Sequence, residues 1–340
     1  MNSNKPTKAK PTWSEIYEGG SPEEENRVFA SLALGMLAIQ EANRAKTDGT
    51  KLTRTLHAKI VAGFTTAHLD VDADLPPEFA VAYFQPGARR TVTLRFSNAS
   101  GIPMPDGTPD MRGAAVRVMQ VDGSFHDLLM TSFPVSHARN ARQFVEFAMI
   151  AASDRALMME RLKEKFGAEE TARMAGNLKQ GIRPCASVAL ESYWSRGAVL
   201  WGDQPVRFQL RPASDAVPAA ALTEGDEDAL RSELESRLAQ GDVRFRLALQ
   251  RYVDEETTPI EDGAIEWREE VSPPIGVATL VIPRHGADLP GIAAQTAEVD
   301  ALAFNPWNAP SDFRPLGNLN RARKIVYRTS AERWQAATAS

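Results

Sequence analysis

The sequence predicts an α+β fold in which a closed antiparallel β-barrel of about eight strands carries helical insertions and a C-terminal helix. Strand-like runs come in two sets, separated by clusters of Gly, Pro, Asn and Asp. The stretch between the two sets, residues 138–180, has apolar side chains at helical spacing. Helix signals stand near both ends of the chain, and a strand number near eight suits a sheet that closes on itself.

The first predicted element is a helix that begins after Ser21. Ser21 is a favourable N-cap, Pro22 suits the first helical position, and three glutamates follow in the first turn. We expect this helix to run to about residue 45 and to be broken at residues 47–50 (TDGT). Its most apolar part, residues 28–39, falls short of the ~20 residues that span a bilayer. The segment therefore predicts a packed helix.

The strands and two further helices follow in order along the chain. Residues 219–240 predict a charged surface helix between two strands of the second set. The last helix is expected from about residue 319 to residue 336, with its apolar side toward the barrel. The strand candidates are residues 60–71, 91–96, 114–121 and 125–131 in the first set, and 198–201, 205–210, 243–253 and 275–282 in the second.

Composition limits the classes of protein that this chain can be. With 340 residues and 43% hydrophobic content it can bury a large core, and we expect one domain over residues 21–340 after a disordered tail, residues 1–20. A net charge of −5 with scattered Lys and Arg argues against nucleic-acid binding. Cys185 is the only cysteine, which excludes an intrachain disulfide and a thiolate metal cage. We therefore expect a cytoplasmic protein without a transmembrane segment or a secretory signal.

An Arg-Lys-Ile-Val-Tyr run near the C-terminus points to metal chemistry. On a helix, residues four apart share a face, so the Arg323 guanidinium would lie one turn from the Tyr327 oxygen. A phenol, with a pKa of about 10, is a poor metal ligand at neutral pH unless a cation favours the phenolate. Tyrosinate is the axial ligand of catalase-type haem. Because such Arg and Tyr pairs are common on helices, the assignment depends on other motifs.

Five short matches, in the family's order, make the chain resemble the catalase superfamily. They extend over residues 50–330, which is far more specific than any one match alone. The matched segments are residues 54–59 (RTLHAK), 94–101 (LRFSNASG), 109–129 (PDMRGAAVRVMQVDGSFHDLL), 134–144 (PVSHARNARQF) and 299–310 (VDALAFNPWNAP), which leads into the helix that carries Tyr327.

The resemblance implies a catalase-like barrel over about residues 57–285, followed by a proximal haem helix within about residues 299–336. The cofactor would be haem b, with Tyr327 as the iron ligand and Arg323 beside it. Arg54 and Arg95 would pair with the haem propionates, because guanidinium groups bind carboxylates in a bidentate manner.

On the opposite side of the haem, the resemblance places the distal histidine at His57 and the haem-side serine at Ser97. His57 would take a proton from the peroxide and return it to the departing oxygen, and Ser97 would fix the imidazole tautomer. The family's distal asparagine falls at Thr131, where a hydroxyl replaces an amide.

Other departures from the family also bear on the pocket. Two aromatic positions that follow the distal segment are Ser136 and His137 here, which implies a more open and more polar pocket. The family's arginine seven residues beyond the tyrosine falls at Trp334, with Arg333 one residue earlier, so the propionate contacts would be rearranged. The chain is much shorter than a typical full-length catalase, so we expect reduced tetramer arms and leave a homo-oligomer open.

Three functions follow from this resemblance. The first is a haem peroxidase or catalase-like oxidoreductase that responds to oxidative stress and consumes hydrogen peroxide or organic hydroperoxides by heterolytic O–O cleavage. The Thr131 substitution favours peroxidase turnover, with an electron donor that the sequence does not identify. The second is a fatty-acid hydroperoxide isomerase or lyase, similar to allene oxide synthase. The third is a non-catalytic haem carrier or sensor, which the retention of both His57 and Tyr327 disfavours.

Overall fold

The computed structural model describes residues 12–47, 54–153, 156–286 and 288–339. Residues 1–11 of the expected tail and residues 48–50 of the expected helix break therefore lie outside the described residues. The remaining part of that tail, residues 12–20, contacts the fold. Glu15, for example, pairs with Arg314 at 2.8 Å.

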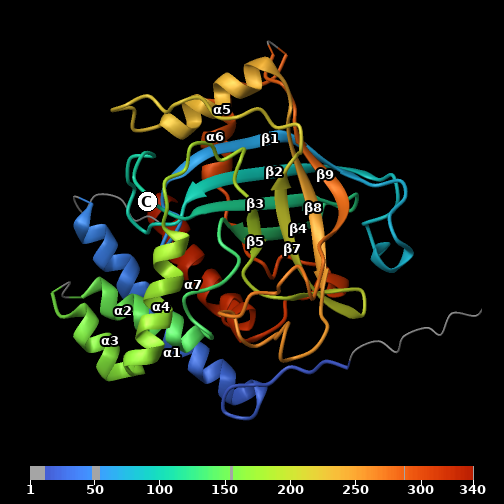
Figure 1. The fold of residues 1–340 in the computed structure, drawn as a ribbon. Helices are drawn as coiled ribbons and strands as arrows, with labels where there is room; N and C mark the ends of the chain where they lie inside the picture. Colours follow the sequence, from blue (N-terminus) through green and yellow to red (C-terminus); the bar gives the residue numbers. More distant parts are fainter. Residues whose placement is uncertain (1–11, 48–53, 154–155, 287, 340) are drawn as a thin grey trace, which may run out of the picture.

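Eight antiparallel strands form the barrel, as predicted (Figure 1). Their order around the barrel is β5, β4, β3, β2, β1, β9, β8 and β7, and pairing between β5 and β7 closes it. A further short strand, β6, pairs with the other edge of β7. The bounds are β1 Ile60–Val71, β2 Arg89–Asn98, β3 Arg112–Met119, β4 Phe125–Thr131, β5 Tyr193–Ser195, β6 Val199–Trp201, β7 Gln204–Pro212, β8 Val243–Arg251 and β9 Ile275–Ile282.

The side chains alternate between the barrel interior and its outer face, as the two-residue period of a strand requires. Phe96 and Tyr193 are fully buried and their rings lie 5.7 Å apart inside the barrel. Their neighbours Ser97 and Trp194 therefore belong to the outer face. In register, Ser97 pairs with Gly113, which pairs with Thr131, which pairs with Trp194. These four residues form one outer row across β2, β3, β4 and β5.

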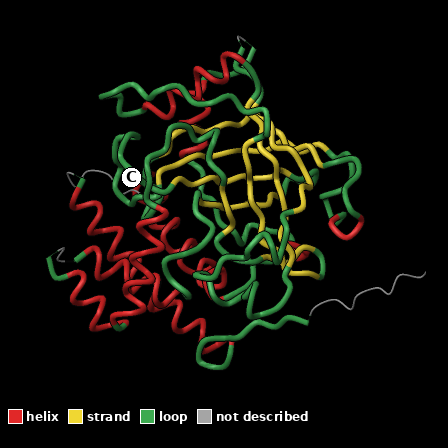
Figure 2. The backbone as a smooth tube through the Cα atoms, in the orientation of Figure 1, coloured by secondary structure: helices red, strands yellow, loops and turns green. Residues whose placement is uncertain are grey.

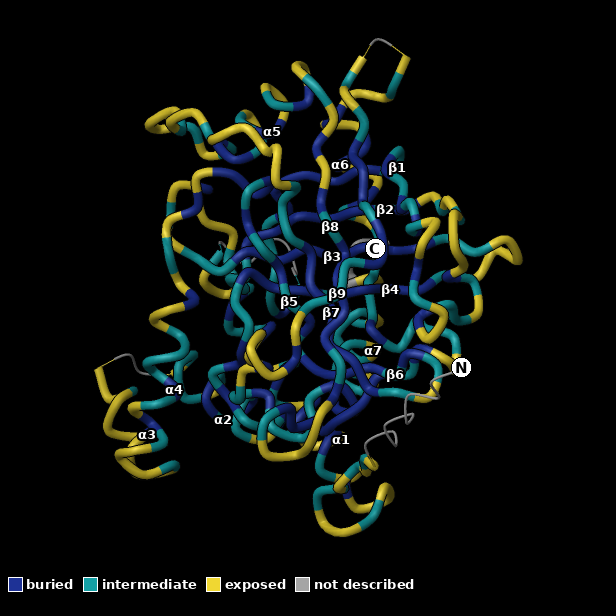
Figure 3. Tube along the Cα trace, turned by 45° about the vertical axis from the view of Figure 1, so that its right-hand side comes forward, coloured by how far each residue is buried: buried dark blue, intermediate teal, exposed yellow. Residues whose placement is uncertain are grey.

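Most helices gather on one side of the barrel (Figure 2). A second apolar core lies between α1, α2 and α7. Buried residues can be seen along these helices in Figure 3. No helix in the described ranges is long and apolar enough to cross a membrane. The helices are α1 Pro22–Lys46, α2 Ala141–Ala152, α3 Met158–Phe166, α4 Ala168–Gly181, α5 Ala229–Gln240, α6 Ile292–Asp300 and α7 Asn318–Ala339, with short 3-10 turns at Pro77–Phe79 and Ser311–Phe313.

The helix that begins after Ser21 is confirmed, since the Ser21 hydroxyl accepts a hydrogen bond from the backbone N–H of Glu24. The helical insertion divides into α2, α3 and α4. One break falls at Gly167, whose φ of 81° favours glycine. Residues 219–228, expected to be helical, precede α5 as loop, while α6 and the three-residue strand β5 had no clear signal of their own.

Arg321 in the first turn of α7 joins this helix to the N-terminal region, residues 15–25, and to the loop at Glu261. Its guanidinium contacts Glu25 of α1 at 2.6 Å, Glu15 at 2.8 Å and Glu261 at 2.9 Å. Its cationic group also lies 4.6 Å from the Tyr17 ring. Burial acts to raise the pKa of Glu15, but the hydrogen bonds from Arg321 and Arg314 outweigh it and lower that pKa. This cluster attaches α7, and with it Tyr327, to the rest of the fold.

Replacing Arg321 with leucine is expected to destabilise the protein by about 3–5 kcal/mol, because three carboxylates would be left near one another without their shared cation. Urea unfolding at neutral pH measures this loss. Arg328→Leu on the same helix is the control, since the Arg328 side chain is 66% exposed and reaches only Glu332 at 4.0 Å. Equal stability of the two variants would contradict the role of the cluster.

Candidate active site

The backbone at His57 is held in an unusual conformation. Its φ of 57° lies in the left-handed region, which costs energy for a residue with a side chain. Two hydrogen bonds offset that cost: the His57 N–H donates to Ala99 O at 3.0 Å, and Arg95 donates to His57 O at 3.0 Å. The His57 backbone is thereby fixed beside the end of β2.

The His57 ring meets Ser97 on the outer face of the barrel. Nδ1 of His57 lies 3.1 Å from the Ser97 hydroxyl oxygen, within hydrogen-bonding distance. Gly113 makes this contact possible, because a Cβ there would lie 2.6 Å from His57 Nδ1 and 2.7 Å from Ser97 Oγ. Sequence reasoning did not single out Gly113, although it stands within the matched segment 109–129. Position 113 requires glycine because the imidazole approaches the backbone too closely for a side chain to fit.

Electrostatics keep His57 in its neutral form. Burial is the main cause that lowers its pKa to about 3, and the guanidinium groups of Arg95, Arg196, Arg323 and Arg54 add to it in that order. A neutral imidazole has one nitrogen that can accept a proton. When Nδ1 carries the hydrogen and donates it to the Ser97 hydroxyl oxygen, Nε2 is the nitrogen left to accept a proton from a substrate.

Arg323 and Tyr327 adopt the geometry that their spacing predicts. An Arg323 N–H group donates to the Tyr327 oxygen at 3.0 Å, and the guanidinium carbon lies 4.8 Å from the centre of the same ring. The cation thus contacts both the hydroxyl oxygen and the ring face of the tyrosine. Asn320, one turn earlier, accepts a second Arg323 N–H at 3.1 Å.

The segment that carries His57 contacts the helix that carries Tyr327. The hydroxyl oxygens of Thr55 and Ser330 lie 2.9 Å apart, although these residues are separated by 275 positions. Asn43 of α1 also donates to Thr55 O at 3.2 Å. The structure thus brings the two matched ends of the chain to one region between the barrel and α7.

Arg54 and Arg95 meet at Asp300, the last residue of α6. The distances from their guanidinium nitrogens to Asp300 Oδ1 are 2.8 Å and 3.3 Å. Arg54 also donates to Leu302 O at 2.8 Å, and the buried Nε of Arg95 has no partner among the described residues. The two arginines are therefore neighbours, as propionate ligands would be, with a carboxylate of this chain already beside them.

Arg196 is a member of the site that sequence reasoning missed. It follows β5, donates to the Met111 sulfur at 3.2 Å and to Val135 O, and forms no ion pair within the described ranges. Burial, and after it the positive charge of Arg323, lower its pKa to about 10, while Tyr327 acts in the opposite direction. No local motif marks this residue, because only barrel closure brings it near α7.

The other residues that the sequence singled out, Thr131, His137 and Arg333, have different surroundings. The Thr131 hydroxyl is buried and has no hydrogen-bond partner in the described structure. The His137 ring packs against Phe144 and Phe147, with ring centres 4.9 Å and 4.7 Å away. Arg333 donates to Leu37 O at 3.1 Å and pairs with Glu41 of α1 at 2.6 Å, so it serves the contact between α1 and α7.

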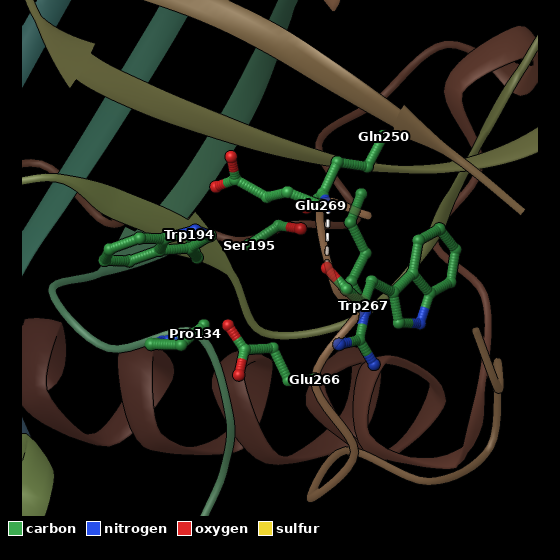
Figure 4. Close-up of a pocket in the computed structure, with 8 residues that line it drawn as sticks. Pro134, Trp194, Ser195, Gln250, Glu266, Trp267 and Glu269 are labelled. Carbon is green, nitrogen blue, oxygen red and sulfur yellow. Dashed lines mark hydrogen bonds between the residues drawn. The ribbon is translucent and has the colours of Figure 1, made fainter. Parts of the chain in front are cut away.

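A small cavity lies beside β5 and β8 (Figure 4). Trp194 and Pro134 line one side, Glu266 lies at another, and Gln250 donates to Trp267 O at 2.7 Å. None of the predicted site residues lines this cavity. Its link to the candidate site is along the sequence, because Ser195 in the cavity wall is followed by Arg196.

The charges of the site suit an anionic, iron-binding macrocycle. Four guanidinium groups surround His57, and Asp300 is the carboxylate paired with two of them. Two propionates and a tyrosinate would balance the remaining positive charge. Four residues of the site keep some accessible surface, namely His57, Arg196, Arg323 and Tyr327. The described residues contain no cluster of three His, Cys, Asp or Glu that could hold a metal ion.

Comparison with known proteins shows what the fold and the sequence are similar to. A bacterial catalase has the same fold, with a TM-score of 0.61 and 15% identity, and the match covers 97% of this chain and 64% of that one. The chain thus spans less than two thirds of that catalase. It is also 26% identical over 297 residues to a catalase-related peroxidase of Mycolicibacterium paratuberculosis (strain ATCC BAA-968 / K-10), which covers 82% of this chain and 88% of the relative. No family model matches the chain.

The protein is thus built on the catalase-like barrel, and the segment that carries the histidine contacts the helix that carries the tyrosine. In sequence and fold the chain is similar to proteins of the catalase-like superfamily, as the sequence motifs predicted.

His137→Phe is expected to reduce the dependence of stability on pH. Burial lowers the pKa of His137 to about 3, so between pH 6.5 and that value the unfolded chain binds a proton that the folded chain excludes. Stability therefore falls as pH falls through this window, by up to about 1.4 kcal/mol per pH unit for this one histidine. Urea unfolding at pH 7 and pH 5 should show a shallower decline in the variant. Above pH 7 both proteins should behave alike, and an unchanged decline below it would contradict the burial of this ring.

Proposed function

We propose that this protein is a haem b-dependent peroxidase with a catalase-like mechanism, formed by residues 21–340 as one domain and acting in the cytoplasm in the defence against peroxides. The observation that carries the proposal is the hydrogen bond from Arg323 to the Tyr327 oxygen, on a helix that contacts the His57 segment. The name of the catalase-related peroxidase relative supports the same class of reaction.

The chain's own side chains would bind and orient the reactants. Tyr327 would hold the iron, Arg323 would keep its oxygen ionised, and Arg54 with Arg95 would hold the propionates. When bound, the haem would supply a redox-active Lewis acid for the peroxide.

His57 would move the proton. As a neutral base it takes the proton from the near peroxide oxygen and returns it to the far oxygen, so that water or an alcohol leaves. Ser97 holds the imidazole in the orientation that this transfer needs. Two electrons from an external donor and two protons then complete the reduction of one peroxide.

Thr131 supports peroxidase turnover over dismutation. Dismutation requires a second peroxide to be oriented at the same centre, and a short hydroxyl reaches less far than the amide of the family. The burial of the Thr131 hydroxyl in the same outer row as Ser97, without a partner among the described residues, supports a role in contacting the substrate.

The same unpaired hydroxyl supports a second candidate, a fatty-acid hydroperoxide isomerase. Isomerisation cleaves the O–O bond and keeps the oxygen in the product, so it needs no electron donor. A fatty-acid hydroperoxide supplied without a donor distinguishes the two. An isomerase converts it stoichiometrically to rearranged product, whereas a peroxidase stops after its first turnover.

The first test uses the purified full-length chain reconstituted with hemin. We expect a strong haem spectrum, loss of the tyrosinate charge-transfer bands in Tyr327→Phe, and loss of roughly 10²–10⁴ in turnover in His57→Ala, which removes the general base. Donor oxidation and an oxygen electrode measure the two activities. A chain that takes up no hemin would refute the proposal, and bleaching by peroxide without turnover would indicate a carrier or sensor.

Thr131→Asn is expected to raise oxygen release relative to donor oxidation, because the amide restores a longer hydrogen-bonding group over the reacting peroxide. Thr131→Val, which has the same shape without the hydroxyl, is the matched control and should not raise the ratio. Rates from the oxygen electrode, divided by rates of donor oxidation in the same sample, give the comparison. An identical ratio in all three proteins would show that this position does not set the balance.

A further inference from the structure

A chain of hydrogen bonds leads from the barrel to the Tyr327 oxygen. The Asn320 amide nitrogen donates to Ala198 O, just before β6, at 2.9 Å. Its amide oxygen accepts from Arg323 at 3.1 Å, and Arg323 donates to the Tyr327 oxygen at 3.0 Å. Asn320 therefore stands between the barrel and the residue that acts on the proposed ligand.

The surroundings leave Asn320 a single orientation. Its side chain is buried, with 3% of the residue exposed. A carbonyl on one side requires a donor, and a guanidinium on the other requires an acceptor, so the amide cannot be turned around. The backbone of the same residue is held as well, because Trp307 donates its ring N–H to Asn320 O at 2.6 Å.

Gly197 provides the space for this amide. A Cβ at Gly197 would lie 2.7 Å from Asn320 Nδ2. The turn around Gly197 is attached to the start of α7 by backbone bonds, since Leu316 N–H donates to Ala198 O at 2.9 Å and Leu200 N–H donates to Arg314 O at 2.8 Å. The barrel turn and α7 thus approach closely, with the amide between them.

Arg323 depends on this amide for its position. Within the described ranges it forms no ion pair, and its side-chain hydrogen bonds go to Asn320 and Tyr327. The neighbouring Arg196 carries the same charge, and that charge disfavours a close approach of the two guanidinium groups. A long arginine side chain without a second anchor would lose its fixed orientation, because its rotamer entropy opposes a single position.

We propose that Asn320 is the positioning residue of the proximal side: it holds Arg323 against Tyr327 and thereby fixes the ligand that this chain offers to iron. The proposal rests on the proposed haem function. It also assigns Gly197 a role, since the absence of its side chain permits the contact between Asn320 and Ala198 O.

The test compares three variants of the full-length chain. Asn320→Leu removes both side-chain hydrogen bonds. Gly197→Ala removes none of the bonding groups but displaces the amide. Asn318→Leu is the matched control, because Asn318 is a buried asparagine of the same helix whose side chain bonds Ala141 N and Glu25, away from Arg323.

Hemin is added to each apoprotein, and three properties are measured: the rate of hemin loss to apomyoglobin, the visible spectrum of the ferric complex, and the melting temperature of the apoprotein. We expect roughly tenfold faster hemin loss in Asn320→Leu, as the loss of a charge-assisted hydrogen bond implies. Its charge-transfer bands should move toward those of Tyr327→Phe. Gly197→Ala should shift the bands in the same direction, and Asn318→Leu should keep the wild-type spectrum even where its melting temperature falls.

The outcomes separate this inference from the proposed function. Wild-type protein that binds no hemin overturns both. Wild-type protein with tyrosinate bands, beside Asn320→Leu and Gly197→Ala variants with the same bands and the same hemin loss, overturns the positioning role alone. Equal spectral change in Asn318→Leu and Asn320→Leu would also overturn it, because a general loss of helix packing would then be sufficient.

Discussion

The pairing of the three-residue strand β5 with β7 is the constraint on which the site depends. Tyr193 pairs with Leu210, and Trp194 pairs with Gln209, so two rungs of the ladder close the barrel. On its other side β5 pairs with the end of β4 through Thr131. Without closure, the chain that follows β5 would have no fixed place. With closure, Arg196 and the turn that bonds Asn320 lie against α7.

Charge explains why the two halves of the site belong together. Burying several guanidinium groups in one region is costly unless anions accompany them. Asp300 forms ion pairs with two of these groups. Arg321, on the same helix as Tyr327, forms ion pairs with three carboxylates of its own cluster. The Arg321 cluster therefore stabilises the position of α7, whereas the guanidinium groups around His57 retain positive charge for a ligand. The neutral state of His57 follows first from its burial and then from the same excess of positive charge.

Much of the fold follows from local pattern. Residues 60–71 form β1 with the predicted bounds, because alternating and β-branched side chains are a direct local signal for a strand. Ser21 capped α1 for an equally local reason. Strand β5 is too short to show an alternation, and α6 lies in a region with weak helical periodicity, so neither had a clear signal. The helix expected from residue 219 begins at Ala229, because charged spacing alone does not start a helix.

The sequence by itself determined the spacing of Arg323 and Tyr327, because helical geometry sets which side chains four residues apart can meet. Its motifs also singled out His57 and Ser97, whose contact the structure places at 3.1 Å. Only the tertiary structure decided that Gly113 makes room for the imidazole and that Asp300 joins Arg54 and Arg95. It also decided that Arg196 lies near α7 and that Asn320 of α7 bonds Ala198 O. The physical reason is that each of these contacts is long-range. These contacts form only when the barrel closes and the helices pack against it. The local sequence around each residue therefore does not indicate which distant residue it will contact.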